Sequence, residues 1–512
     1  MTDDRPSARR GLLPGGLLAL GGAAVLFGAQ LIDTDVSVRL AGSDRPVNIG
    51  AGDLADISAH NSPTVVRNPR DRDNLAVTSR IDSPDFSCTL HVSTDGGSRW
   101  TRTRVPIPAG PARKCYAPDA AFGPDGTLHF SYVTLRGVGN TPAAVWVASS
   151  RDSGRTLGTP RRVTGPLAFQ VRIAADPGTP GRLYATWLQA REVGSLRFTG
   201  PGNPVMAARS DDGGASWGRP VRVSDPRRGR VLAPSAAVGP DGELYVLFLD
   251  VGQDRLDYEG AHDAVGGPPY PGRFSLVVAR SRDRGTTWGE SVVDERVMAT
   301  RRFVVFLPPS PSLAVDRRDG RLYVGFEDAR RGKSDVLVWS LAPGSTAWSD
   351  PVRVNDTPRD DGTTQYLPRL AVAPGGRLDV VYYDRRDDRR RDVRNEVSLQ
   401  SSDDGGRTFT SPRVVLSSRP FDSRIGLGSE RGLADLGSRL GLASADAGAF
   451  AVWSDTRAGT AASSKQDIVG ARVVVDPSSR GDSLMTGLRL AGVALILGGL
   501  AVTLVTLRRR RD

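Results

Sequence analysis

Three copies of one short pattern carry the side chains of this sequence that are best suited to chemistry. Each copy has an aromatic residue at the first position, Asp at the third and Arg at the fifth. The copies span 326–330, 382–386 and 453–457, so the acids are Asp328, Asp384 and Asp455 and the arginines are Arg330, Arg386 and Arg457. A planar guanidinium binds a carboxylate through two parallel hydrogen bonds. The arginines therefore predict a binding site for a carboxylate ligand. The structural alternative is that each Arg pairs with an Asp of its own loop or of a neighbouring blade.

A second repeated phrase, Ser-x-Asp-x-Gly-x-Thr-Trp, indicates turns. It begins at Ser93, Ser150, Ser210, Ser281 and Ser402. Its acids are Asp95, Asp152, Asp212, Asp283 and Asp404, and its tryptophans are Trp100, Trp217 and Trp288. Glycine at the fifth position permits a positive φ, and the Ser and Asp side chains can bond the amides of their own turn. We therefore interpret these acids as structural, with the aromatic residue packed between neighbouring units.

The turn phrase alternates with a hairpin phrase, as in "AAFGPDGTLHFSYV" at 120–133. One hairpin and one turn phrase make a four-stranded antiparallel unit, and seven such units follow one another between residues 60 and 475. Repeats of four short strands at this period are typical of a β-propeller. The sequence thus predicts an all-β, seven-bladed propeller, with a six-bladed ring as the alternative. The last unit lacks its fourth strand, and residues 46–50 are expected to supply it and close the ring.

The strand order assigns each loop to one end of the propeller. We label the strands of a blade A to D from the centre outward. The A–B and C–D turns share one end, here named the turn end, and the B–C and D–A loops share the other, named the loop end. Ligands are expected at the loop end, where the arginine pattern falls. Cys88 and Cys115 are both placed at the loop end, so a disulfide between them is expected.

The Ser-x-Asp phrases resemble the Asp-box, or BNR, repeats of sialidases and sialidase-like propellers. Sialidases hold the carboxylate of sialic acid with an arginine cluster and use a Tyr nucleophile, a Glu partner and an Asp acid. The resemblance implies Arg330, Arg386 and Arg457 as the grip. It implies Tyr366 or Tyr383 as nucleophile, Glu327 as its partner and Asp328 or Asp384 as acid.

The chain also departs from the sialidase pattern. Sialidases have six blades as a rule, and they carry a Phe/Tyr-Arg-Ile-Pro motif before the first box. Here only "TSRID" at 78–82 stands in that region, without the proline and close to Ser93. These departures favour a non-catalytic module over an exo-α-sialidase.

Both ends of the chain carry an uncharged apolar run. Residues 11–32 are long enough to span a bilayer, as a transmembrane helix or an uncleaved signal anchor, and a cleaved signal peptide is the alternative. The second uncharged run is 490–507, directly after Arg489. Residues 484–507 are expected to form a second transmembrane helix, followed by a basic tail at 508–512. The positive-inside rule places residues 1–10 and that tail in the cytosol. Residues 33–483 would then lie outside the plasma membrane.

Composition excludes several other functions. Two cysteines are too few for a disulfide scaffold, and four histidines without ligand spacing predict no metal site and no cofactor. Part of the net charge of +11 lies at the two ends, so the charge does not argue for a nucleic-acid partner. The sequence predicts a membrane-anchored binding or scaffold module for envelope glycans or partner proteins. A sialidase-type glycoside hydrolase is the alternative function, and a weaker third is an assembly factor for membrane complexes.

Overall fold

The computed structural model describes residues 37–48, 58–193, 202–252, 274–300, 309–359, 361–425 and 436–476, together with the helical residues 491, 493–497 and 501. Residues Arg39–Val474 form one compact unit, and Met1–Val38 with Val475–Asp512 form another. Among the described residues, no helix is long and apolar enough to cross a membrane. The two predicted transmembrane segments, 11–32 and 484–507, lie outside the described residues except for the few helical positions named above.

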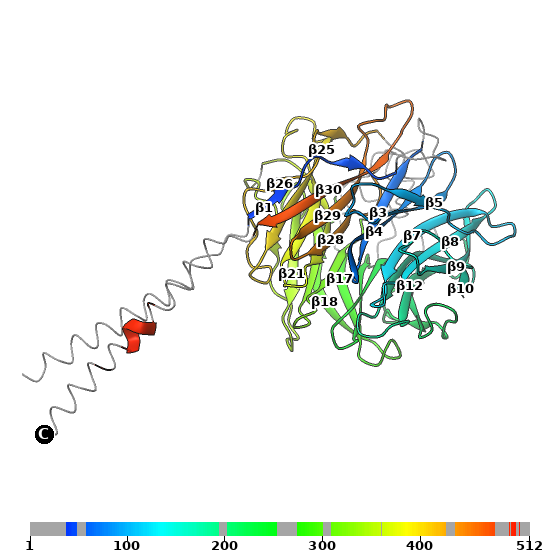
Figure 1. Cartoon of the computed structure of the whole chain (residues 1–512). Helices are drawn as coiled ribbons and strands as arrows, with labels where there is room; N and C mark the ends of the chain where they lie inside the picture. Colours follow the sequence, from blue (N-terminus) through cyan, green and yellow to red (C-terminus); the bar gives the residue numbers. More distant parts are fainter. Residues whose placement is uncertain are drawn as a thin grey trace, which may run out of the picture. The chain divides into compact units, whose positions relative to one another are not determined.

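The described residues of the larger unit form seven antiparallel sheets, which are the blades of a propeller (Figure 1). Blade 1 contains β3 (His60–Asn68), β4 (Asp71–Ile81), β5 (Ser87–Ser93) and β6 (Thr101–Thr103). Blade 2 contains β7 (Lys114–Phe122), β8 (Leu128–Arg136), β9 (Thr141–Ser150) and β10 (Arg161–Thr164). Blade 3 contains β11 (Ala168–Ala175), β12 (Leu183–Gln189), β13 (Val205–Ser210) and β14 (Val221–Arg222).

The remaining blades follow the same order along the chain. Blade 4 contains β15 (Val231–Val238), β16 (Leu244–Asp250), β17 (Phe274–Ser281) and β18 (Gly289–Val297). Blade 5 contains β19 (Ser312–Val315), β20 (Leu322–Asp328), β21 (Asp335–Leu341) and β22 (Val352–Arg353). Blade 6 contains β23 (Gln365–Val372), β24 (Leu378–Asp384), β25 (Arg394–Ser402) and β26 (Val414–Val415), and β27 (Phe421–Asp422) also pairs with β25. The seventh sheet excludes the six-bladed alternative.

Blade 7 joins the two ends of the propeller. Its strands β28 (Gly441–Ala445), β29 (Gly448–Asp455) and β30 (Asp467–Asp476) are completed by β1 (Ser37–Leu40) and β2 (Arg45–Pro46), which both pair with β30. The closing strand therefore starts before the predicted 46–50. Pro46 has no N–H to donate, and beyond it the Asn48 side chain accepts from the Ile468 amide at 2.6 Å. Figure 1 shows the blue strands of blade 1 beside the orange strands of blade 7.

The turn phrase builds the same hydrogen-bonded turn in each blade that carries it. In blade 3 the Ser210 hydroxyl donates to Asp212 at 2.8 Å and accepts from the Gly214 amide at 2.9 Å, while Asp212 accepts from the Ser216 amide at 2.9 Å. Gly214 has a φ of +85°, and a Cβ there would lie 3.3 Å from Val147 of blade 2. Each tryptophan packs toward the preceding blade. Trp217 packs against a hydrophobic cluster shared by blades 2 and 3. Trp288 packs against a cluster that contains Tyr184 of blade 3, and Trp100 packs against Phe450 of blade 7.

Losing one of these turn carboxylates is expected to make the fold more sensitive to acid. Hydrogen bonds from the Ser216 side chain and amide lower the pKa of Asp212 to about 2. The turn therefore contributes stability above the ordinary carboxyl pKa of about 4, and that contribution is lost as the pH falls through about 2. We expect Asp212→Asn to lower the free energy of unfolding by about 1 kcal/mol at pH 7 and by less near pH 2.5, as measured by denaturant unfolding. The exposed Asp241→Asn variant is the control. An Asp212→Asn deficit that does not shrink in acid would contradict this account.

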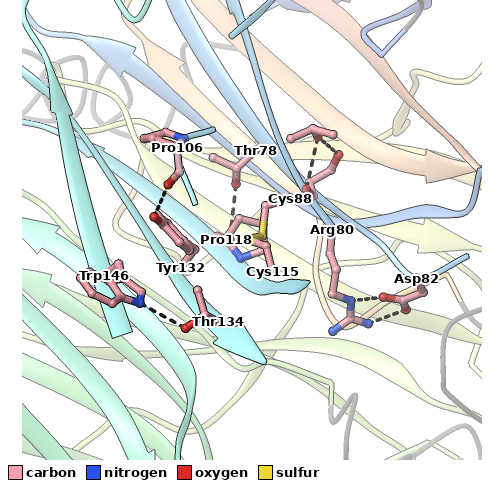
Figure 2. The surroundings of a disulfide bond; sticks show 12 residues. Thr78, Arg80, Asp82, Cys88, Pro106, Cys115, Pro118, Tyr132, Thr134 and Trp146 are labelled. Carbon is pink, nitrogen blue, oxygen red and sulfur yellow. Dashed lines mark hydrogen bonds and ion pairs between the residues drawn. A yellow bond between two sulfur atoms is a disulfide. The ribbon is translucent and has the colours of Figure 1, made fainter. Parts of the chain in front are cut away.

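A disulfide between Cys88 of β5 and Cys115 of β7 joins blades 1 and 2, with a Cα–Cα distance of 5.4 Å. Both sulfurs are buried in a cluster with Leu90 and Tyr132. Figure 2 shows this bond with the Arg80–Asp82 ion pair in the same view, near the end of β4. The crosslink thus ties the first two blades together at the loop end.

Candidate functional site

The innermost strands share an irregularity that shapes the axis of the propeller. In five blades the A strand has a β-bulge at a residue with positive φ. These residues are Ser62, Ala117, Gln170, Ala233 and Leu367, with φ between 49° and 52°. A bulge bends its strand and redirects the following side chains. The residue two positions after each bulge therefore determines which side chain that blade contributes near the axis. These residues are Thr64, Asp119, Arg172, Ser235 and Arg369.

Two of these five groups are arginines, Arg172 and Arg369. Arg439 adds a third guanidinium near them, and we name Arg172, Arg369 and Arg439 the axial arginine cluster. They come from blade 3, blade 6 and the residue pair before β28, far apart in the chain. Arg439 donates to the Thr64 hydroxyl at 3.0 Å and to the Pro118 carbonyl at 2.8 Å. Arg172 donates to the Val171 carbonyl at 3.1 Å and to the Ser310 hydroxyl at 3.3 Å. The Nε of Arg369 is buried and has no hydrogen-bond partner in the structure.

The carboxylate beside this cluster is that of Asp119. One of its oxygens accepts from the Thr64 hydroxyl at 3.0 Å, and the other accepts from the Ile173 amide at 3.1 Å. In the described ranges, no ion pair joins Asp119 to an arginine of the cluster. Arg80 lies nearby, but Asp82 already neutralises it, and its guanidinium sits 4.7 Å from the Tyr116 ring centroid. Within the described residues, three cations therefore lie near one carboxylate; Arg439 is buried, and Arg172 and Arg369 are half-buried.

The electrostatics of the cluster reflect this excess of positive charge. Burial lowers the pKa of Arg439 well below its ordinary value, and the neighbouring Arg172, Arg369 and Arg80 lower it further, while Asp119 raises it. Burial likewise lowers the pKa of Arg172 and of Arg369. A guanidinium nevertheless stays protonated in proteins. The cluster is therefore a set of mutually repelling charges that an anion would stabilise.

A small cavity opens beside the cluster. Its volume is about 20 Å³. Its lining includes Arg80, Arg172 and Arg439 together with Ser62, Tyr116, Gln170, Ser310 and Ser438. These residues lie near the beginnings of the inner strands, which is the loop end. The space holds a water molecule or a small anion, and it is too small for a sugar ring.

The sequence-predicted arginines occupy a different part of the fold. Each one joins the last residue of its B strand to a second acid on or beside an outer strand, which belongs to the preceding blade for Arg330 and Arg386 and to blade 7 itself for Arg457. Arg330 joins Asp328 to Asp294, Arg386 joins Asp384 to Asp356, and Arg457 joins Asp455 to Asp44. Blade 4 lacks the Arg of the pattern, and there Arg228 joins Asp250 to Glu290 instead. The structure thus places these arginines in three separate groups of ion pairs, two of which join neighbouring blades, and does not bring the arginines together.

The residues predicted for catalysis are buried within blades 5 to 7. Tyr383 donates to the carbonyl of Ser454 and accepts from its amide, both at 3.0 Å. Glu327 accepts from the Thr300 hydroxyl at 2.6 Å and from the Leu367 amide at 2.5 Å. Tyr366 donates to Asn395 at 2.7 Å. Tyr366, Tyr383 and Glu327 are each 0% exposed. Tyr383 and Glu327 thus connect adjacent blades, whereas Tyr366 bonds within blade 6, where its ring centroid lies 5.2 Å from that of Tyr383.

Asp328 and Asp384, the predicted acids, are also enclosed, with side-chain exposures of 0%. Burial raises the pKa of Asp328, against the effect of Arg330, and burial likewise raises that of Asp455. Asp384 accepts from Ser398 at 2.9 Å in addition to Arg386. These acids are the buried partners of Arg330 and Arg386 in the ion pairs described above.

Sequence reasoning missed Asp119, Arg172, Arg369 and Arg439. One signal was available, because a charged residue interrupts an otherwise apolar inner strand in "QVRIAA" and in "YLPRLAV". An apolar strand that carries one Arg is informative, since lysine and arginine are almost never buried without a partner.

Comparisons with known proteins give structural similarity only. No protein-family model matches the sequence, and no curated protein matches it. Among solved structures, the chain is similar to the Hadza microbial sialidase Hz136 at 15% identity and a TM-score of 0.45, over 79% of this chain and 75% of that one. It is similar to a protein of unknown function from Dyadobacter fermentans at 14% identity and a TM-score of 0.46, over 86% and 99%. It is also similar to the NanB sialidase of Streptococcus pneumoniae at 10% identity and a TM-score of 0.43, over 66% and 67%.

Proposed function

We propose that this chain is a non-catalytic propeller that binds an anionic group of an envelope glycan or partner protein at its axial arginine cluster. The observation that carries the proposal is the convergence of Arg172, Arg369 and Arg439 on one carboxylate beside a cavity at the loop end. Charge-assisted hydrogen bonds from arginine are the usual means of holding a carboxylate. The ligand would present its carboxylate to this cavity and keep its bulk outside.

The absence of catalysis is part of the proposal. Hydrolysis of a glycosidic bond needs a nucleophile or base and an acid that reach the same bond. Tyr383, Tyr366 and Glu327 are each fully buried and hydrogen-bonded to other protein groups, which supports a binding role over a sialidase-type reaction. The Asp-box assignment of the turn phrases belongs to the same proposal, since their shared geometry fits a structural repeat.

The location is proposed from the sequence. Residues 11–32 and 484–507 would anchor the propeller in the plasma membrane, with residues 33–483 outside. The disulfide between Cys88 and Cys115 is compatible with an oxidising compartment.

The test uses the full chain in detergent micelles. Binding of acidic oligosaccharides, with uronic or sialic acid carboxylates, is compared with binding of their methyl esters by calorimetry. We expect the acid forms to bind and the esters not to bind. Arg369→Met is expected to weaken binding about 10- to 100-fold, because it removes one charged donor. Arg136→Met, an exposed arginine at the end of β8, is the matched control.

The same samples are assayed for turnover with a fluorogenic sialoside and a panel of other glycosides. No turnover is expected. Turnover that disappears in Tyr383→Phe would replace the proposal with the hydrolase. Equal binding of acids and esters, in a folded protein, would reject the axial cluster as the ligand site.

A further inference from the structure

We infer that, without its ligand, the axial arginine cluster holds a small monovalent inorganic anion such as chloride. The inference starts from charge. Arg172, Arg369 and Arg439 bring three positive charges to the axis, and Asp119 brings one negative charge. Unpaired buried charges are costly, and proteins meet that cost with a partner or a bound ion. Within the described residues the cluster is left with an excess of positive charge.

Hydrogen bonding points to the same conclusion. The Nε of Arg369 lies buried without a partner, although guanidinium donors are rarely left unmet. In the described residues no hydrogen bond joins Arg369 to Asp119, whose two oxygens accept from Thr64 and Ile173. An anion near the cluster would accept from Arg369 without competing with those bonds.

The size and lining of the cavity select the kind of anion. About 20 Å³ is enough for one water-sized particle. Arg80, Arg172 and Arg439 line this space together with Ser62 and Ser310, and each of these side chains can donate a hydrogen bond. A monatomic anion suits such a site, whereas sulfate and larger anions exceed its volume.

The anion would have two consequences. It would connect blades 3, 6 and 7 through the cluster, so the stability of the ligand-free propeller would depend on its concentration. It would also compete with the carboxylate ligand, and this second consequence alone rests on the proposed function. Ligand binding would then be an exchange that chloride opposes.

The test measures thermal unfolding of the full chain in micelles as sodium gluconate is replaced by sodium chloride at constant ionic strength. Constant ionic strength removes the general screening effect of salt. We expect the unfolding temperature to rise with chloride and to saturate. Arg369→Met is expected to flatten this dependence, and Arg136→Met is expected to keep it. Chloride-35 NMR line broadening by the wild-type protein, reduced in Arg369→Met, gives a second readout that does not depend on stability.

The outcomes separate the two proposals. A flat chloride dependence together with absent line broadening would overturn the anion site and would mean that the chain supplies its own counter-charge. Stabilisation by acetate but not by chloride would also overturn it, while leaving the carboxylate proposal intact. Saturable chloride binding without any carboxylate ligand would support the anion site and reject the proposed function. Carboxylate binding that weakens as chloride rises would support both.

Discussion

Arg386→Met is expected to lower the free energy of unfolding by about 3 kcal/mol, because it leaves the buried Asp384 carboxylate with only a more distant counter-ion. The Asp384 side chain is 0% exposed and Arg386 is its closest cation, with Asp356 on the other side of the guanidinium. Arg413 would remain 3.5 Å from Asp384, and Gln365 and Ser398 would still donate to it without carrying charge. Denaturant unfolding of the full chain in micelles measures the loss.

The double variant Arg386→Met with Asp384→Asn is the discriminating companion. Removing both charges together is expected to cost clearly less than the sum of the two single changes, as the coupling within a buried pair requires. Arg424→Met removes an exposed arginine whose pair with Asp422 lies at the surface, and it is expected to change stability little. If Arg386→Met kept full stability but lost ligand binding, Arg386 would be a ligand grip, as the sequence pattern first suggests.

Asp119→Asn is the second large effect, with an expected loss of about 3 kcal/mol. The substitution keeps the size of the side chain and one acceptor for Thr64, but it removes the negative charge beside Arg172, Arg369 and Arg439. Adding Arg369→Met to this variant removes one repelling charge and is expected to restore part of the loss. Denaturant unfolding of the two single variants and the double variant measures the sign of the coupling.

The chloride dependence of the Asp119→Asn variant provides a further check. Because the variant has more excess charge on the axis, its unfolding temperature is expected to rise more with chloride than that of the wild type. An Asp119→Asn protein as stable as the wild type in gluconate would show that the cluster is not under electrostatic strain.

Much of the propeller follows from local patterns. The glycine at the fifth position of the turn phrase, as at Gly214, is explained by a positive φ, which the motif encodes locally, and by contact with the preceding blade, which recurs because the blade recurs. The missing strand of the last unit was sufficient to predict closure by the N-terminal segment. Its residues were shifted, because Pro46 cannot donate and Asn48 bonds through its side chain.

The pattern of aromatic, Asp and Arg was visible in the sequence, but its role was open. In a linear sequence, an Arg two positions after an Asp fits an ion pair and a ligand grip equally well. Only the tertiary structure decides between the two roles. It places Asp294, Asp356 and Asp44, which are distant in the chain, beside the three guanidinium groups.

The sequence by itself determined the blade, since each turn and hairpin is encoded within a few neighbouring residues. It also predicted the closure of the ring and seven blades, with six as the alternative that the structure then excluded. Only the tertiary structure decided which charges meet on the axis. Arg172, Arg369 and Arg439 come from three separate blades, and bulges near Gln170 and Leu367 set the register of the first two. That convergence depends on closing the ring, which brings together side chains that no local pattern connects.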